Sequence, residues 1–178
     1  MSGRIVAIVI LACGLIAGAA VWYLQVYGYY HAVEPAPGRD VRLAARGTGE
    51  PQPIPYADFQ AIDAESSPIR YRACFTTTAD PAELAREYET LENRVPRVGP
   101  FWFRCFDAGK IDEAIQSGRA TLFLGESNVS YGVDRIIAIT GDGHGYVWHD
   151  LNDCGEKAYD GTELGADCPP LPNAKGGE

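Results

Sequence analysis

The chain has 178 residues, with 24 acidic residues against 15 Lys and Arg, and its formal net charge is −9 at pH 7. This balance argues against two classes of partner, nucleic acid and an anionic membrane bound over a broad flat face, because both are negatively charged. The length leaves room for one membrane helix and one domain of roughly 110–140 residues.

An uncharged apolar stretch, Ile5–Leu24, lies near the N-terminus. A bilayer core of about 30 Å requires roughly 20 apolar residues in a helix, so we expect residues 5–24 to span a lipid bilayer. Arg4 precedes the stretch and the next Lys or Arg is Arg39, which favours a cytoplasmic N-terminus and a domain on the other side. Aromatic residues typical of the headgroup level follow: Trp22, Tyr23, Tyr27, Tyr29 and Tyr30. Residues 1–30 are therefore expected to be an uncleaved signal-anchor.

Two other interpretations of this stretch stay open. The small residues at 17–19 are of the kind found at a signal-peptide cleavage site, although the apolar and aromatic run continues past them. The surroundings of Cys13 have the outline of a lipoprotein cleavage site, but strongly apolar sequence follows.

Gly14 and Gly18 form a GxxxG pattern, which lets two helices approach closely and predicts a homodimer through the membrane helix. Glycine is also simply common in membrane helices.

Four of the five cysteines lie after the apolar stretch. An even number outside the membrane is typical of disulfides formed in an oxidising compartment. Of the three pairings that four cysteines allow, we favour Cys74–Cys105 and Cys154–Cys168. The second pair closes a loop of roughly 15 residues. In the chain-entropy model, a disulfide across such a loop stabilises the folded protein by about 3 kcal/mol. The alternative is a zinc site, but the spacing lacks a close C-x-x-C pair.

The rest of the chain predicts a mixed α+β domain with its elements in the order ββαβαβββ. Residues 31–55 are rich in Pro, Gly and Arg and are expected to form a juxtamembrane linker, with a short strand near Asp40–Ala44. The domain is expected over 56–178, with a disulfide-clipped C-terminal tail. In chain order its elements are strands Phe59–Asp63 and Ile69–Thr76, a helix from Asp80, a strand Phe101–Phe106, a helix Asp107–Ser117, a strand Ala120–Leu124, and a hairpin of Gly132–Thr140 with Gly145–Asp150.

The helix from Asp80 has both a start signal and a periodic face. Asp80 and Pro81 are a typical N-cap and first helical residue. Apolar residues then recur at helical spacing up to a stop at Val95-Pro96: Leu84, Tyr88 and Leu91.

Several segments resemble an uncharacterised family of small single-pass bacterial membrane proteins: RYRACF (Arg70–Phe75), FLGESNVSYGVDR (Phe123–Arg135), GYVWHDLNDCG (Gly145–Gly155) and AYDGTELGADCPP (Ala158–Pro170). The similarity extends over nearly the whole chain, including the anchor. It implies a bacterial inner-membrane protein with a periplasmic domain, and it carries no established activity or functional residue. Such proteins are sometimes labelled histidine kinases automatically, but this chain has no Gly-rich ATP-binding motif and is too short for a kinase core with a sensor.

Two histidines are candidates for a metal or acid–base site. His144 lies in the expected hairpin turn with Asp142, and His149 ends the returning strand beside Asp150. Strand alternation places Trp148 and His149 on opposite faces. We therefore favour an ordinary turn histidine and an ordinary strand histidine, and we expect no metal or other cofactor.

A surface of aromatic residues and arginines is the more suggestive candidate. Its members are expected on neighbouring strands and turns: Arg70, Arg72, Trp102, Tyr131, Arg135 and Trp148. If these side chains are exposed, they could contact a protein partner or hold an anion. If they are buried, they belong to the core and to local ion pairs, which is the interpretation we favour.

The function that this sequence favours is a membrane-anchored periplasmic accessory or protein-interaction module in the bacterial inner membrane. Its partner would be a membrane or periplasmic protein. A periplasmic domain that senses a small ligand or signal is the first alternative, and a deep pocket lined by arginines and aromatic side chains would favour it. A His-dependent metal enzyme is the second alternative, and it requires converging His and Asp side chains.

Overall fold

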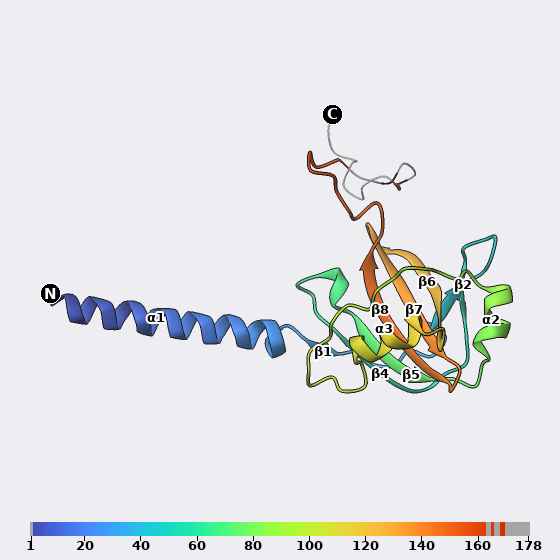
Figure 1. Ribbon diagram of the computed structural model, residues 1–178, viewed down its shortest axis with the longest axis horizontal. Helices are drawn as coiled ribbons and strands as arrows, with labels where there is room; N and C mark the ends of the chain where they lie inside the picture. Colours follow the sequence, from blue (N-terminus) through green and yellow to red (C-terminus); the bar gives the residue numbers. More distant parts are fainter. Residues whose placement is uncertain (1, 163–164, 166–167, 170–178) are drawn as a thin grey trace.

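A long apolar helix and a curved antiparallel sheet are the two main parts of the molecule (Figure 1), a computed structural model that describes residues 2–162, 165, 168 and 169. Residues 170–178, the end of the expected tail, lie outside the described residues. Helix α1 spans Gly3–Tyr23, and the π-helical turn η1 (Leu24–Gly28) continues it. Together they form a helix that is long and apolar enough to cross a membrane. In Figure 1 α1 projects from one side of the domain.

Six strands form the main sheet in the order β1-β4-β5-β8-β7-β6, and each neighbouring pair is antiparallel. The strands are β1 (His31–Ala32), β4 (Ala57–Asp63), β5 (Arg72–Thr76), β6 (Ala120–Ser130), β7 (Val133–Thr140) and β8 (His144–Leu151). A separate pair consists of β2 (Arg42–Ala44) and β3 (Pro51–Pro53). The helices are α2 (Pro81–Glu87), α3 (Ala108–Gln116) and the short 3₁₀ turn η2 (Pro68–Arg70). This arrangement confirms the expected α+β class.

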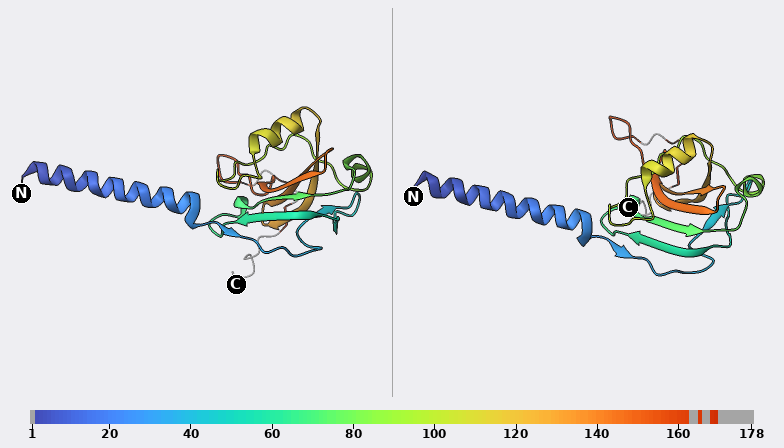
Figure 2. Two further views of the ribbon diagram at one scale, coloured as in Figure 1. Left: turned by 90° about the horizontal axis from the view of Figure 1, so that it is seen from below. Right: turned by 60° about the horizontal axis from the view of Figure 1, so that its bottom comes forward.

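Apolar side chains cover both faces of the sheet. Along β7, Ile137 belongs to a cluster on the face that β2 covers, whereas Ile136 belongs to a cluster on the face that α3 covers. Figure 2 shows α3 over its face of the sheet. Because successive side chains of a strand point to opposite faces, a strand covered on both sides is apolar at nearly every position. This explains the continuous apolar run of β7.

Residues 31–55, expected to form a linker, supply β1, β2 and β3. Val41, Leu43 and Ile54 from this stretch are buried in the core cluster on the β2 face. Only Tyr29 and Tyr30 separate η1 from β1. The chain therefore enters the folded domain almost directly from the helix.

The structure corrects two local predictions. Residues 101–106 form turns and not a strand; their backbone does not pair with the sheet, and Phe103 and Phe106 instead pack against the α3 face. Helix α2 ends at Glu87, well before the expected stop. The chain after α2 pairs with neighbouring strands: Tyr88 forms a bridge with Ala45, and the Leu91 N–H donates to the Leu122 oxygen over 3.0 Å.

Both predicted disulfides are confirmed. Cys74 on β5 is bonded to Cys105, with a Cα–Cα distance of 6.2 Å. Cys154 is bonded to Cys168, with a Cα–Cα distance of 5.5 Å. The first bond attaches residues 101–106 to the sheet, and the second closes the loop that follows β8.

Candidate functional site

The junction between the apolar helix and the domain brings together two of the predicted surface residues, Trp102 and Arg70. Trp102 belongs to residues 95–106, which we call the aromatic loop. Its indole Nε1 donates a hydrogen bond to the Val26 oxygen over 2.8 Å. Its ring stacks on Tyr27 at 6.1 Å between centroids and meets the edge of Tyr30 at 5.8 Å. The aromatic loop therefore packs directly on the end of the helix.

Arg70, at the end of η2, contacts the same end of the helix. Its Nη2 donates to the side-chain oxygen of Gln25, and its guanidinium lies 5.6 Å from the centre of the Tyr30 ring. A cation over an aromatic face is an attractive arrangement. The η2 turn and the aromatic loop, far apart in sequence, thus meet on η1. We call this set of contacts the anchor junction.

Arg72 holds the aromatic loop in place from inside the domain. Its side chain is buried. Four backbone oxygens accept hydrogen bonds from its guanidinium, those of Ile69, Tyr71, Arg97 and Val98, at 2.6–3.1 Å. Burial lowers its pKa to about 10. Because its donors are directed at backbone oxygens, Arg72 is a structural residue here and not part of a surface that could hold an anion.

His149 and Arg135 form a second, buried polar group on the sheet with Tyr71. The His149 ring stacks on Tyr71 at 4.7 Å, and the Arg135 guanidinium lies 4.9 Å from the Tyr71 ring centre. His149 Nδ1 lies 2.8 Å from the Pro68 oxygen, and its Nε2 accepts from Arg135 Nε over 3.2 Å. Burial, with a smaller contribution from the charge of Arg135, lowers the His149 pKa to about 4. Both ring nitrogens have partners, so His149 is not placed to bind a metal or to move a proton.

The structure does not bring His144 to His149. His144 pairs with Thr76 at one end of β8, whereas His149 pairs with Arg135 near the other end. The two histidines are five positions apart along the strand, a distance of roughly 17 Å. The His144 Nδ1 lies 3.4 Å from a carboxylate oxygen of Asp142 in the exposed hairpin turn. The converging His and Asp side chains that a metal enzyme would require are therefore not formed by this pair.

The other two predicted surface residues also lie away from the anchor junction. Trp148 is fully buried in the cluster beneath α3. Tyr131 lies between β6 and β7 and is half-buried. The predicted set is thus divided among the junction, the core and a turn.

Sequence reasoning missed a polar cluster that joins the β6–β7 turn to the disulfide-bonded loop after β8. The Asp134 carboxylate accepts hydrogen bonds from Ser127 Oγ, the Asn128 N–H and Asn152 Nδ2, at 2.7–3.1 Å. The Asn152 side-chain oxygen accepts from the Cys154 N–H over 3.0 Å. These residues all lie in the segments that carry the family resemblance. That location was the only signal that could have indicated them, and their role in the structure is to hold two loops together.

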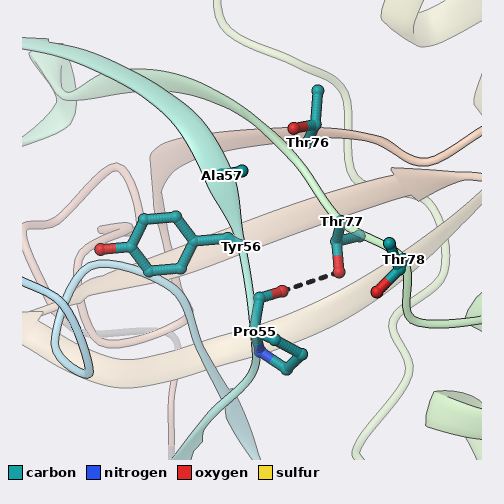
Figure 3. A pocket seen from close by; sticks show the side chains of 6 residues that line it. All are labelled: Pro55, Tyr56, Ala57, Thr76, Thr77 and Thr78. Carbon is teal, nitrogen blue, oxygen red and sulfur yellow. Dashed lines mark hydrogen bonds between the residues drawn. The ribbon is translucent and has the colours of Figure 1, made fainter.

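Several open hollows lie on the surface of the described residues, and two of them are at different ends of the domain. Figure 3 shows the smaller, about 230 Å³, lined by Pro55, Tyr56, Ala57, Thr76, Thr77 and Thr78. The Thr77 hydroxyl donates to the Pro55 oxygen over 2.7 Å at its edge. The larger, about 440 Å³, lies between the aromatic loop and the start of α3, and Phe101, Phe103 and Arg104 are among its lining residues. Both grooves are open to solvent.

Comparison with known proteins gives one family match. Residues 41–169 match the model of a family of unknown function, DUF6446. The match covers most of the domain and not the apolar helix. No curated protein and no solved structure matches the chain.

Proposed function

We propose that this chain, which belongs to the family of unknown function DUF6446, is a membrane-anchored accessory module that presents its domain to a protein partner in the periplasm. The hydrogen bond from Trp102 to Val26 is the observation that carries the proposal. It joins a helix long enough to cross a membrane to a folded domain. A domain fixed in this way has a defined orientation relative to the membrane, which suits the positioning of a partner.

The compartment follows from the cysteines and the charges around the helix. Two disulfides suggest that the domain folds in an oxidising compartment. Arg4 at the start of the apolar helix, with no further Lys or Arg until Arg39, favours a cytoplasmic N-terminus. The family resemblance adds a bacterial inner membrane, so the domain would lie in the periplasm.

The end of the domain opposite α1 is the surface that we assign to the partner. Figure 1 shows α2 at this end, on the far side of the domain from α1. The groove of Figure 3 lies where the start of β4 meets the end of β5, because Ala57 pairs with Thr76. Strand β1 lies at the other end of β4, because His31 pairs with Asp63. The lining of the groove is mainly apolar, with threonine side chains at the edge, so it could accommodate an apolar side chain of a partner.

Photo-crosslinking of the full-length protein in native membranes tests the proposal. A crosslinker replaces Thr78, which is exposed beside the groove, and a control crosslinker replaces Glu113, which is exposed on α3. We expect a discrete crosslinked partner from position 78 and none from position 113. A full-length protein that yields only uncrosslinked monomer from both positions, and no partner on gentle extraction, would contradict the accessory role.

Association of two copies through α1 is a separate part of the proposal. Gly14 and Gly18 lie on one face of α1, and a Cβ added at either would meet no atom within 4 Å. Replacing both with Ile should abolish dimers in mild detergent, because the helices could no longer approach closely. The matched control replaces Ala12 and Ala20 with Ile, because these residues face the opposite side of the helix at about 100° per residue. Equal dimer fractions in the two variants would remove the GxxxG interface.

A further inference from the structure

The aromatic loop exposes large apolar side chains beside the end of the apolar helix. Val98 is 81% exposed, Phe101 is 71% exposed and Val95 is 61% exposed. Among the described residues from 31 onward, Tyr159 is the only other large apolar side chain that is comparably exposed. Large exposed apolar patches mark sites that contact a protein partner, a membrane or a ligand. Nothing in the described part of the domain covers these three side chains.

The position of Phe101 along the helix axis corresponds to the headgroup region of a bilayer. Its ring meets the edge of Tyr27 at 6.0 Å between centroids. Tyr27 follows Leu24, the last residue of the apolar stretch, by three residues, or about 4.5 Å of helix. The headgroup region is about 5–7 Å thick on each side of the hydrocarbon core. A bilayer that α1 spans therefore reaches the aromatic loop without any rearrangement of the domain.

The local charge of this segment is opposite to that of the whole chain. The aromatic loop, residues 95–106, includes two arginines and no acidic residue, in a chain with a net charge of −9. Arg97 forms an ion pair with Asp150, which leaves the charge of Arg104. Arg104 is exposed and makes no ion pair with any residue that the structure describes. It also lines the larger groove with Phe101 and Phe103. Arginines next to apolar side chains are attracted to anionic headgroups, whereas the rest of the domain is repelled by them.

We propose that the aromatic loop is a second membrane contact, in which Val98 and Phe101 insert into the headgroup region of the leaflet from which the apolar helix emerges. Arg104 lies at the same level and pairs with lipid phosphate. The inference deepens the proposed function, because it requires the membrane anchor and adds a lipid surface as the partner of the loop. Cys74–Cys105 and Arg72 fix the loop in the position that the insertion requires.

Depth-dependent quenching of a fluorophore tests this contact in the full-length protein. The protein carries Cys13→Ala, and single cysteines for labelling with the polarity-sensitive dye NBD replace Val98, Phe101 or Ala82. Ala82 is the matched control, because it is exposed on α2 at the other end of the domain. A label at Trp22 reports the anchor itself. The protein is reconstituted in vesicles of phosphatidylethanolamine and phosphatidylglycerol, with or without a lipid that carries a nitroxide near its headgroup.

We expect the nitroxide lipid to reduce emission from labels at 98, 101 and 22 by about two-fold or more, because interfacial residues lie within about 5–10 Å of the acyl boundary. The label at position 82 should be unaffected. Quenching at 22 with none at 98 and 101 would overturn the second contact and leave the anchor intact. An unquenched label at 22 would overturn both the anchor and this inference. Loss of quenching at 101 on Arg104→Glu, with an unchanged circular dichroism spectrum, would support the role of Arg104.

Discussion

The indole nitrogen of Trp102 donates a hydrogen bond to the backbone oxygen of Val26 over 2.8 Å, and the two residues are separated by 76 positions in the chain. The same indole stacks on Tyr27 and meets the edge of Tyr30. A backbone oxygen near the end of a helix otherwise lacks an intrahelical partner. The domain therefore supplies a hydrogen-bond donor to a backbone oxygen at the end of the apolar helix.

Replacing Trp102 with Ala should loosen the anchor junction. The change removes one hydrogen bond of about 1 kcal/mol and aromatic contacts of similar size, so amide hydrogen exchange at residues 25–31 should accelerate about ten-fold or more. Hydrogen exchange of the full-length protein in detergent micelles measures this effect. Trp102→Phe is the matched control and should give an intermediate rate, because it keeps the ring contacts and loses the donor. Unchanged exchange in the Ala variant would contradict the contact.

Replacing Arg72 with Met should destabilise the domain severely. The change leaves backbone oxygens of residues such as Arg97 and Val98 without donors inside the protein. Each unsatisfied buried group costs about 1–3 kcal/mol, so the free energy of unfolding should fall by about 3 kcal/mol or more. Urea unfolding measures the loss. Arg104→Met is the control, because Arg104 is exposed, and it should stay within about 0.5 kcal/mol of the parent.

His149 should make stability depend on pH between about 4 and 6.5. Its pKa is about 4 in the folded protein, against 6.5 as the ordinary value. As the pH falls through this window, the unfolded chain binds a proton and the folded protein does not. The free energy of unfolding should therefore decrease on acidification, by on the order of 3 kcal/mol across the window. Above pH 6.5 this loss of unfolding free energy is absent, and below pH 4 it has reached its full size.

The measurement compares urea unfolding of the parent protein and of His149→Gln at several pH values. The variant lacks the titrating imidazole, so the difference in stability between the two proteins should shrink as the pH falls from 6.5 to 4. The two proteins share every other side chain, so contributions that do not involve residue 149 cancel in the difference. A difference that stays constant with pH would show that the imidazole is accessible to protons in the folded state.

Replacing Gly132 with Ala should destabilise the protein much more than replacing Gly118, a glycine with a similar φ. Gly132 has φ +75°, and an added Cβ would lie 2.4 Å from the Cα of Gly155. Gly118 has φ +71°, and an added Cβ there would meet no atom within 4 Å. Gly118→Ala should cost about 1 kcal/mol of backbone strain, whereas Gly132→Ala should cost about 3 kcal/mol because of the added overlap. Equal losses in chemical denaturation would show that the loop after β8 can move away.

The features that local sequence determines were predictable. The apolar helix follows from twenty uncharged residues, and the β7–β8 hairpin follows from apolar runs around a turn that requires Gly143, whose φ is +86°. The start of α2 follows from its cap, since the Asp80 side chain accepts from the Ala82 N–H over 2.8 Å. The even number of cysteines predicted two disulfides, and the short loop between Cys154 and Cys168 favoured the pairing that the structure shows.

The features that depend on contacts distant in sequence were not predictable. Aromatic residues at 101–106 favour a strand, but their backbone is fixed by turns, by Cys105 and by the distant Arg72. The apolar spacing of Tyr88 and Leu91 indicates a helix, but open strand edges at β2 and β6 compete for the same backbone groups. Trp102 was among the predicted surface residues, but its partner on the helix could not be identified from either segment alone.

Two residues of chain separate the helical segment from β1, and the Trp102–Val26 bond spans even that short connection. A domain on a flexible tether samples a volume that grows with the length of the tether. This domain has almost no tether, so it would remain at one height above the bilayer and move only within the membrane plane. A partner would then encounter it through lateral diffusion or by arriving at that height, and changes in the tilt of the helix would turn the whole domain.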